Sequence, residues 1–145
     1  MINVKFLVYL VAVLGGAALS MEGAIAGELG KTVGKLESSY YIFIMGTLIL
    51  GLTTLFAGKG DLPYVLKAPK WNLTGGLLGT VYLTILVISI PFIGIGVSMV
   101  AVIVGQMITS MIIEHFGWLG SSKIKINKER VMAIVCMGIA LVLIF

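Results

Sequence analysis

The chain has 145 residues, of which 59% are hydrophobic and only 11% are charged, and its mean hydropathy is +1.15. A soluble domain of this size has too little interior to bury so much apolar surface. The composition therefore predicts an integral membrane protein of the all-α class, in contact with the lipid bilayer. The net charge of +4 does not indicate nucleic-acid binding, because the basic residues are spread between apolar runs.

The apolar runs predict five transmembrane helices in a single membrane domain over residues 1–145. We expect spans near 4–26, 39–57, 72–90, 95–115 and 129–145. The turn-forming sequence GKGDLP (58–63) stops the second span, and PFIGIG (91–96) separates the third from the fourth. Because PFIGIG is uncharged, we expect either a tight outer hairpin, which we favour, or a turn buried below the headgroups.

The first apolar run also has features of a cleaved signal peptide: a lysine, an apolar stretch and small residues. We disfavour this alternative because cleavage would remove one of several similar spans.

The lysines and arginines predict the orientation of the chain. With five spans, the N-terminus and two loops share a side that carries eight basic residues: Lys5, Lys59, Lys67, Lys70, Lys123, Lys125, Lys128 and Arg130. The opposite side has only Lys31 and Lys35. The positive-inside rule then places the N-terminus in the cytoplasm and the C-terminus outside the inner (plasma) membrane.

Glu22 is an acidic residue within the first predicted span. If that span is centred near Gly16, Glu22 lies about 9 Å from the midplane, inside the roughly 15 Å half-thickness of the hydrocarbon. Glu28, at about 18 Å, is expected to be a solvated cap. A carboxylate in hydrocarbon is costly and commonly functional, so Glu22 is a candidate for proton coupling or cation binding. The alternative is that the helix leaves the bilayer at this point.

Other polar residues extend the candidate substrate or ion pathway. Tyr82 lies near the middle of the third span, where its hydroxyl needs a partner. The fourth span carries Gln106, Ser110 and Glu114 at i, i+4 and i+8, on one helix face. An interhelical hydrogen bond is an equal alternative for Gln106, and Glu114 is expected near the cytoplasmic interface.

Small residues recur at helical spacing beside these polar groups. Gly16 precedes Ser20 by four residues, and Gly23 precedes Gly27 by four. Ser20 is in addition a candidate residue of the substrate or ion pathway. The third span has Gly75 and Gly79 at the same spacing. Such pairs let helix backbones approach closely in lipid, so we interpret the glycines as packing positions.

The sequence predicts no enzyme and no cofactor. It lacks the GxSxG, HExxH and P-loop motifs, and one histidine cannot form a multi-histidine metal site. Cys136, the only cysteine, excludes an intrachain disulfide and makes a thiolate metal site improbable. No metal ligands are therefore expected.

Several segments occur together in the order of a known family. These are KAPKWNLTGGLLGTVYLT (67–84), PFIG (91–94), the pair GQ (105–106) and EHFGWLG (114–120). In this combination the chain resembles the YdcZ-like small membrane proteins of the drug/metabolite transporter superfamily. Glu22 stands where the family pattern commonly has glutamine, and an amide there cannot titrate.

The resemblance implies a five-helix subunit equal to half of a ten-helix transporter with inverted repeats. It implies a subunit of a secondary transporter or exporter of small organic or amphipathic solutes, paired with an antiparallel second subunit. That subunit is a second copy or a paralogue of opposite orientation. The bias of eight basic residues against two disfavours insertion of the same chain in both orientations, which an antiparallel homodimer requires. A parallel dimer is compatible with the positive-inside rule. The alternative function is a membrane assembly subunit that transports nothing.

Overall fold

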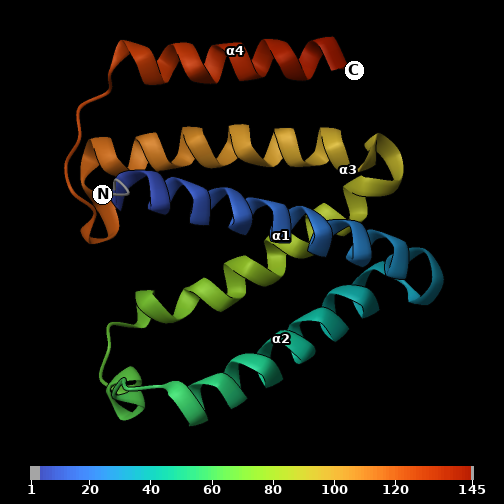
Figure 1. Cartoon of the computed structure of the whole chain (residues 1–145), viewed down its shortest axis with the longest axis vertical. Coiled ribbons are helices and arrows are strands. Elements are labelled where there is room, and N and C mark those ends of the chain that lie inside the picture. Colours follow the sequence, from blue (N-terminus) through green and yellow to red (C-terminus); the bar gives the residue numbers. More distant parts are fainter. Residues whose placement is uncertain (1–3, 145) are drawn as a thin grey trace. The chain divides into compact units, whose positions relative to one another are not determined.

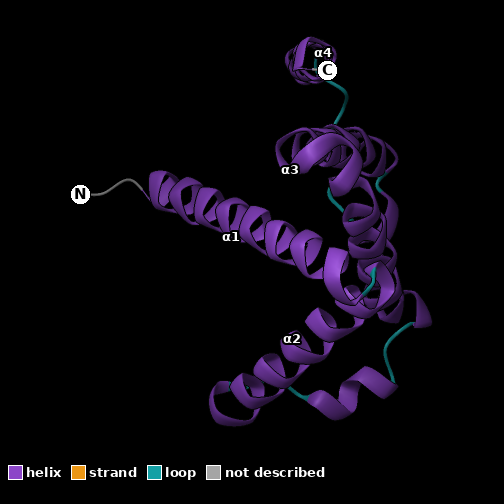
Figure 2. Cartoon of the chain, turned by 90° about the vertical axis from the view of Figure 1, so that its right-hand side faces the viewer, coloured by secondary structure: helices purple, strands orange, loops and turns teal. Residues whose placement is uncertain are grey.

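The computed structural model describes residues 4–144, which form helices and no strand (Figures 1 and 2). The predicted all-α class is therefore confirmed. The long helices are α1 (Val4–Val33), α2 (Lys35–Ala57), α3 (Gly75–Phe116) and α4 (Lys128–Ile144). Short 3-10 turns occupy Leu62–Leu66, Lys70–Thr74 and Trp118–Gly120 in the connections. Phe145, the last residue of the predicted fifth span, lies outside the described residues.

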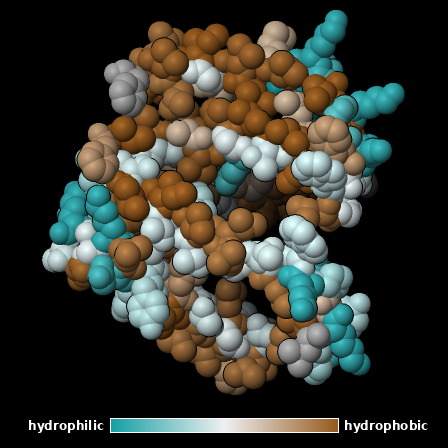
Figure 3. Space-filling model, turned by 180° about the vertical axis from the view of Figure 1, so that it is seen from behind, coloured by the Kyte–Doolittle hydropathy of each residue, from teal (hydrophilic) through white to brown (hydrophobic). Residues whose placement is uncertain are grey.

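Large apolar side chains are exposed along all four long helices. Figure 3 shows hydrophobic residues over most of the face in view, with hydrophilic residues gathered in a few clusters. Within residues 4–144, three helical stretches are long and apolar enough to cross a membrane: Val4–Val33, Lys35–Ala57 and Lys70–Phe116. Surface of this kind is stable only against lipid or another apolar partner.

A single residue, Gly34, joins α1 to α2, so both helices run beyond the spans predicted from hydropathy. Gly34 has φ 108°, a backbone conformation that favours glycine, and its carbonyl accepts a hydrogen bond from the Ser38 amide at 3.0 Å. The polar residues at 28–37 continue the helices because they include no proline and several good helix formers. Glu28 is therefore exposed within α1, where it pairs with Lys31 at 2.7 Å, and does not cap the helix.

The break expected at PFIGIG occurs at Gly94. Its φ of 77° and ψ of 163° interrupt α3, which is otherwise helical from residue 75 to 116. Only glycine adopts this backbone conformation without large strain. The Ser98 hydroxyl donates to the Gly94 carbonyl at 2.7 Å, so that acceptor is satisfied despite the break.

The chain divides into two compact units, Met1–Phe92 and Ile93–Phe145. In the first unit, α1 and α2 meet at Gly34 and diverge from it (Figures 1 and 2). Its buried residues include six near that meeting point or on the first part of α3 (residues 75–92): Ala26, Ser38, Ser39, Leu83, Leu86 and Val87. In the second unit, Ser98 and Met99 are buried.

Candidate functional site

The small-residue face of α1 is the contact surface of the first unit. Gly23, Ala26, Gly27 and Gly30 are buried at i, i+3, i+4 and i+7, one continuous helix face. A Cβ placed on Gly27 would lie 2.8 Å from Cγ2 of Ile90, and one on Gly30 would lie 2.9 Å from Cγ1 of Val87. The absence of side chains therefore lets Ile90 and Val87 of α3 reach the backbone of α1.

Ser38 of α2 is also buried against α1. The Ser38 side chain is fully buried, and its hydroxyl donates to the Ala26 carbonyl at 2.7 Å. The Lys35 ammonium lies 4.9 Å from the centre of the Phe92 ring, a cation–π contact between the start of α2 and α3. These contacts fix the α1–α2 turn against the first part of α3.

The predicted packing glycines differ in their surroundings. Gly23 and Gly27 are buried in the α1 face, and a Cβ on Gly79 would lie 3.6 Å from the Phe43 ring. A Cβ on Gly16 or Gly75 would meet no atom within 4 Å in the part of the chain that the structure describes. Gly30 was not predicted as a packing position, although it follows Gly27 by three residues and lies on the same helix face.

The structure brings two predicted pathway residues, Glu22 and Tyr82, near each other. Glu22 is exposed on α1 directly before the buried face, and Ser20 is half-buried two residues earlier. Tyr82 lies on α3 within the range over which the Glu22 carboxylate acts on it electrostatically, and no hydrogen bond joins the two side chains among the described residues. Two helices far apart in the sequence thus bring a carboxylate and a phenol within electrostatic range of each other in one unit.

The Tyr82 hydroxyl is buried and has no hydrogen-bond partner within residues 4–144. Burying an unpaired polar group costs about 1–3 kcal/mol, so few occur in folded proteins, and each one calls for an explanation. Within the same residues, Glu22 also forms neither an ion pair nor a hydrogen bond. A donor and an acceptor without partners in an apolar setting are suited to bind a polar or cationic group.

The other predicted pathway residues belong to the second unit. Gln106 and Ser110 are exposed, and the Ser110 hydroxyl donates to the Met107 carbonyl of its own helix at 3.1 Å. Glu114 forms an ion pair with Arg130, which links the end of α3 to the start of α4. The sequence did not predict this pairing, because sixteen residues and an irregular connection separate the partners.

Within residues 4–144, no cluster of three or more histidine, cysteine or acidic residues is placed to hold a metal ion. Cys136 is exposed on α4.

Three helical stretches long and apolar enough to cross a membrane indicate an integral membrane protein. The family described as "Putative inner membrane exporter, YdcZ" matches residues 7–143, and the chain belongs to this family. The resemblance found in the sequence is therefore confirmed over nearly the whole chain. No curated protein and no solved structure matches the chain.

Proposed function

We propose that this protein is a subunit of a secondary transporter that exports small organic or amphipathic solutes, and that it performs no enzymatic reaction. The observation that carries the proposal is the exposed Glu22 carboxylate within electrostatic range of the buried Tyr82 hydroxyl, neither of which has a partner within residues 4–144. Membership in a family of inner membrane exporters supports the same reading. Glu22 would receive a proton or a cationic group, and Tyr82 would position it.

The helix lengths support five membrane crossings. At 1.5 Å per residue, the 42 residues of α3 extend about 63 Å, roughly twice the hydrocarbon thickness, with a backbone break at Gly94. The 17 residues of α4 extend about 25 Å, close to one crossing. With α1 and α2 this gives five spans, and the lysine distribution favours a cytoplasmic N-terminus.

A second, antiparallel subunit would complete the pathway. A carboxylate facing lipid costs a few kcal/mol, and a partner helix laid over Glu22 would remove that cost. Two five-helix subunits of opposite orientation would form an inverted repeat around a shared midplane site. Because the basic residues lie mostly on one side of the membrane, the favoured partner in the cell is a paralogue with the opposite distribution of lysine and arginine. Purified copies of this chain would still pair with each other through the same surfaces.

Purified protein in liposomes is expected to move solutes or protons. We would screen a broad panel of small organic and amphipathic solutes by electrical recording and by flux. The Tyr82→Phe variant should transport the active solute about two- to tenfold more slowly, the effect of losing one hydrogen bond. Its stability should be unchanged or higher, because the substitution removes an unpaired buried hydroxyl.

The matched control is Tyr41→Phe, because Tyr41 is an exposed tyrosine on α2. This variant should transport at the rate of the unmodified protein. Silence across the panel by correctly assembled protein would instead support the alternative of a membrane assembly subunit. Equal transport rates in both tyrosine variants and the unmodified protein would show that Tyr82 is not part of the transport pathway.

The orientation of the chain can be measured with a C-terminal reporter that is active on one side of the membrane only. In cells that lack a partner, we expect a signal from the outer side alone. Eight basic residues lie on the proposed cytoplasmic side and only two lie on the side of the C-terminus. Signals from both sides would show that one sequence inserts in both directions and would support an antiparallel homodimer. A cytoplasmic signal alone would contradict either the predicted cytoplasmic N-terminus or the odd number of spans, and a reporter at the N-terminus would distinguish the two.

A further inference from the structure

The connection between α3 and α4 alternates lysine with isoleucine. The sequence KIKINK (123–128) follows the 3-10 turn Trp118–Gly120, and residues 121–127 are not helical. Two hydrogen bonds hold this segment against the end of α3. The Ile124 amide donates to the Glu114 carbonyl at 3.0 Å, and the Ser121 hydroxyl donates to the Ile113 carbonyl at 3.3 Å. The segment is therefore anchored at the predicted membrane interface.

The carboxylates of the second unit leave the lysines of this segment unneutralised. Glu114 pairs with Arg130, and Glu129 accepts a hydrogen bond from the Asn127 amide group at 3.3 Å. In the part of the chain that the structure describes, none of the three exposed lysines 123, 125 and 128 forms an ion pair. Three ammonium groups thus lie within six residues of each other and are open to an anionic ligand.

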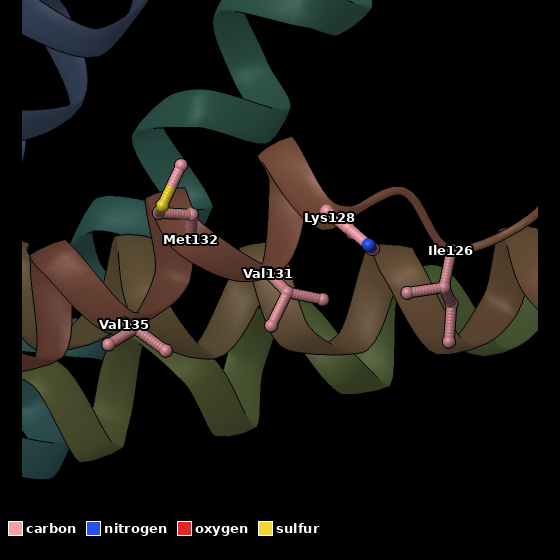
Figure 4. Close-up of a pocket in the computed structure, with 5 residues that line it drawn as sticks. All are labelled: Ile126, Lys128, Val131, Met132 and Val135. Carbon is pink, nitrogen blue, oxygen red and sulfur yellow. The ribbon is translucent and has the colours of Figure 1, made fainter.

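An open apolar hollow begins at the same place. Its lining consists of Ile126, Lys128, Val131, Met132 and Val135. Residues 128, 131, 132 and 135 share one face of α4, at i, i+3, i+4 and i+7. Figure 4 shows Val135, Val131, Lys128 and Ile126 from left to right, so the Lys128 ammonium lies between the apolar side chains of α4 and Ile126, at the start of the helix.

A molecule that fits this surface carries an anionic head and a hydrocarbon chain. We propose that the second unit binds an anionic phospholipid, with the headgroup phosphate on Lys128 and its neighbouring lysines and one acyl chain along the hollow of α4. Lysine clusters directly beside a transmembrane helix attract anionic headgroups. The stacked rings of Phe116 and Trp118, 5.2 Å apart, lie at the same end of α3, as is common where helices pass the headgroup level. This inference does not depend on transport.

Native mass spectrometry of the purified protein in detergent tests the proposal. Phosphatidylglycerol should bind at least about tenfold more tightly than phosphatidylcholine with the same acyl chains. The variant Lys123→Gln/Lys125→Gln/Lys128→Gln should weaken phosphatidylglycerol binding on the order of a hundredfold. The matched control, Lys59→Gln/Lys67→Gln/Lys70→Gln, removes the same charge from another loop and should bind phosphatidylglycerol as the unmodified protein does.

The hollow is tested separately. Val131→Ser/Val135→Ser should weaken phosphatidylglycerol binding about tenfold through lost apolar contact. Met137→Ser/Ile144→Ser, on the opposite face of the same helix, should not. Circular dichroism and gel filtration would verify that all variants keep their helices and their assembly state.

Three results would overturn the proposal: equal affinity for both lipids, equal losses in the two lysine variants, or equal losses in the two α4 variants. Displacement of the lipid by millimolar glycerol phosphate would also overturn it, because a free phosphate would then be sufficient.

Discussion

Leucine in place of Gly30 is expected to destabilise the first unit by about 3 kcal/mol, the upper part of the range for overpacked cores. A Cβ alone would lie 2.9 Å from Val87 Cγ1, and Val87 is fully buried, so it has little room to move. The remaining leucine atoms would force α1 away from α3 and weaken the hydrogen bond from Ser38 to Ala26. Gly27→Leu should have a similar effect through Ile90. Unfolding of the detergent-solubilised protein, followed by circular dichroism, measures both.

Gly16→Leu is the matched control for this prediction. It lies on the same helix, but a Cβ there would meet no atom within 4 Å among the described residues. Leucine also favours helix over glycine by several tenths of a kcal/mol, so this variant should be as stable as the unmodified protein or slightly more stable. Equal destabilisation at positions 16 and 30 would contradict the assignment of the contact face.

Glu22→Gln is expected to abolish the pH dependence of transport and to lower its rate at least about tenfold, the lower limit for losing a hydrogen bond to a charged group. The amide keeps the size of the side chain but cannot take up or release a proton. Helix content and unfolding should not change, because Glu22 is exposed and makes no ion pair within residues 4–144. Proton-coupled flux in liposomes between pH 5 and 9 is the measurement.

Two further variants make the result specific. Glu28→Gln removes the same charge from the same helix, at a carboxylate that is 75% exposed and paired with Lys31, and should leave the pH profile unchanged. Glu22→Asp keeps an ionisable group and should retain a pH-dependent rate. An unchanged pH profile in Glu22→Gln would reduce Glu22 to a packing or helix-end residue.

Local sequence determined the membrane class, the helical fold and the chain breaks. The end of α2 at Ala57 agrees with the prediction because GKGDLP cannot continue a helix. The break in α3 falls at Gly94, inside the predicted PFIGIG turn, because glycine alone adopts that backbone conformation readily. Family membership also followed from short motifs in order. Each of these properties depends on residues close together in the chain.

Only the tertiary structure decided which side chains meet. Tyr82 lies sixty residues after Glu22, and hydropathy places both in spans without showing that α1 packs against the first part of α3. The same reason explains why Ser38, which lies outside the predicted spans, is buried and bonded to Ala26, and why Glu114 pairs with Arg130. In lipid, apolar side chains gain little by facing protein, so hydropathy alone does not identify the buried face. Contact of the Ile90 and Val87 side chains with Gly27 and Gly30 identifies that face, and it depends on the positions of these two residues in another helix.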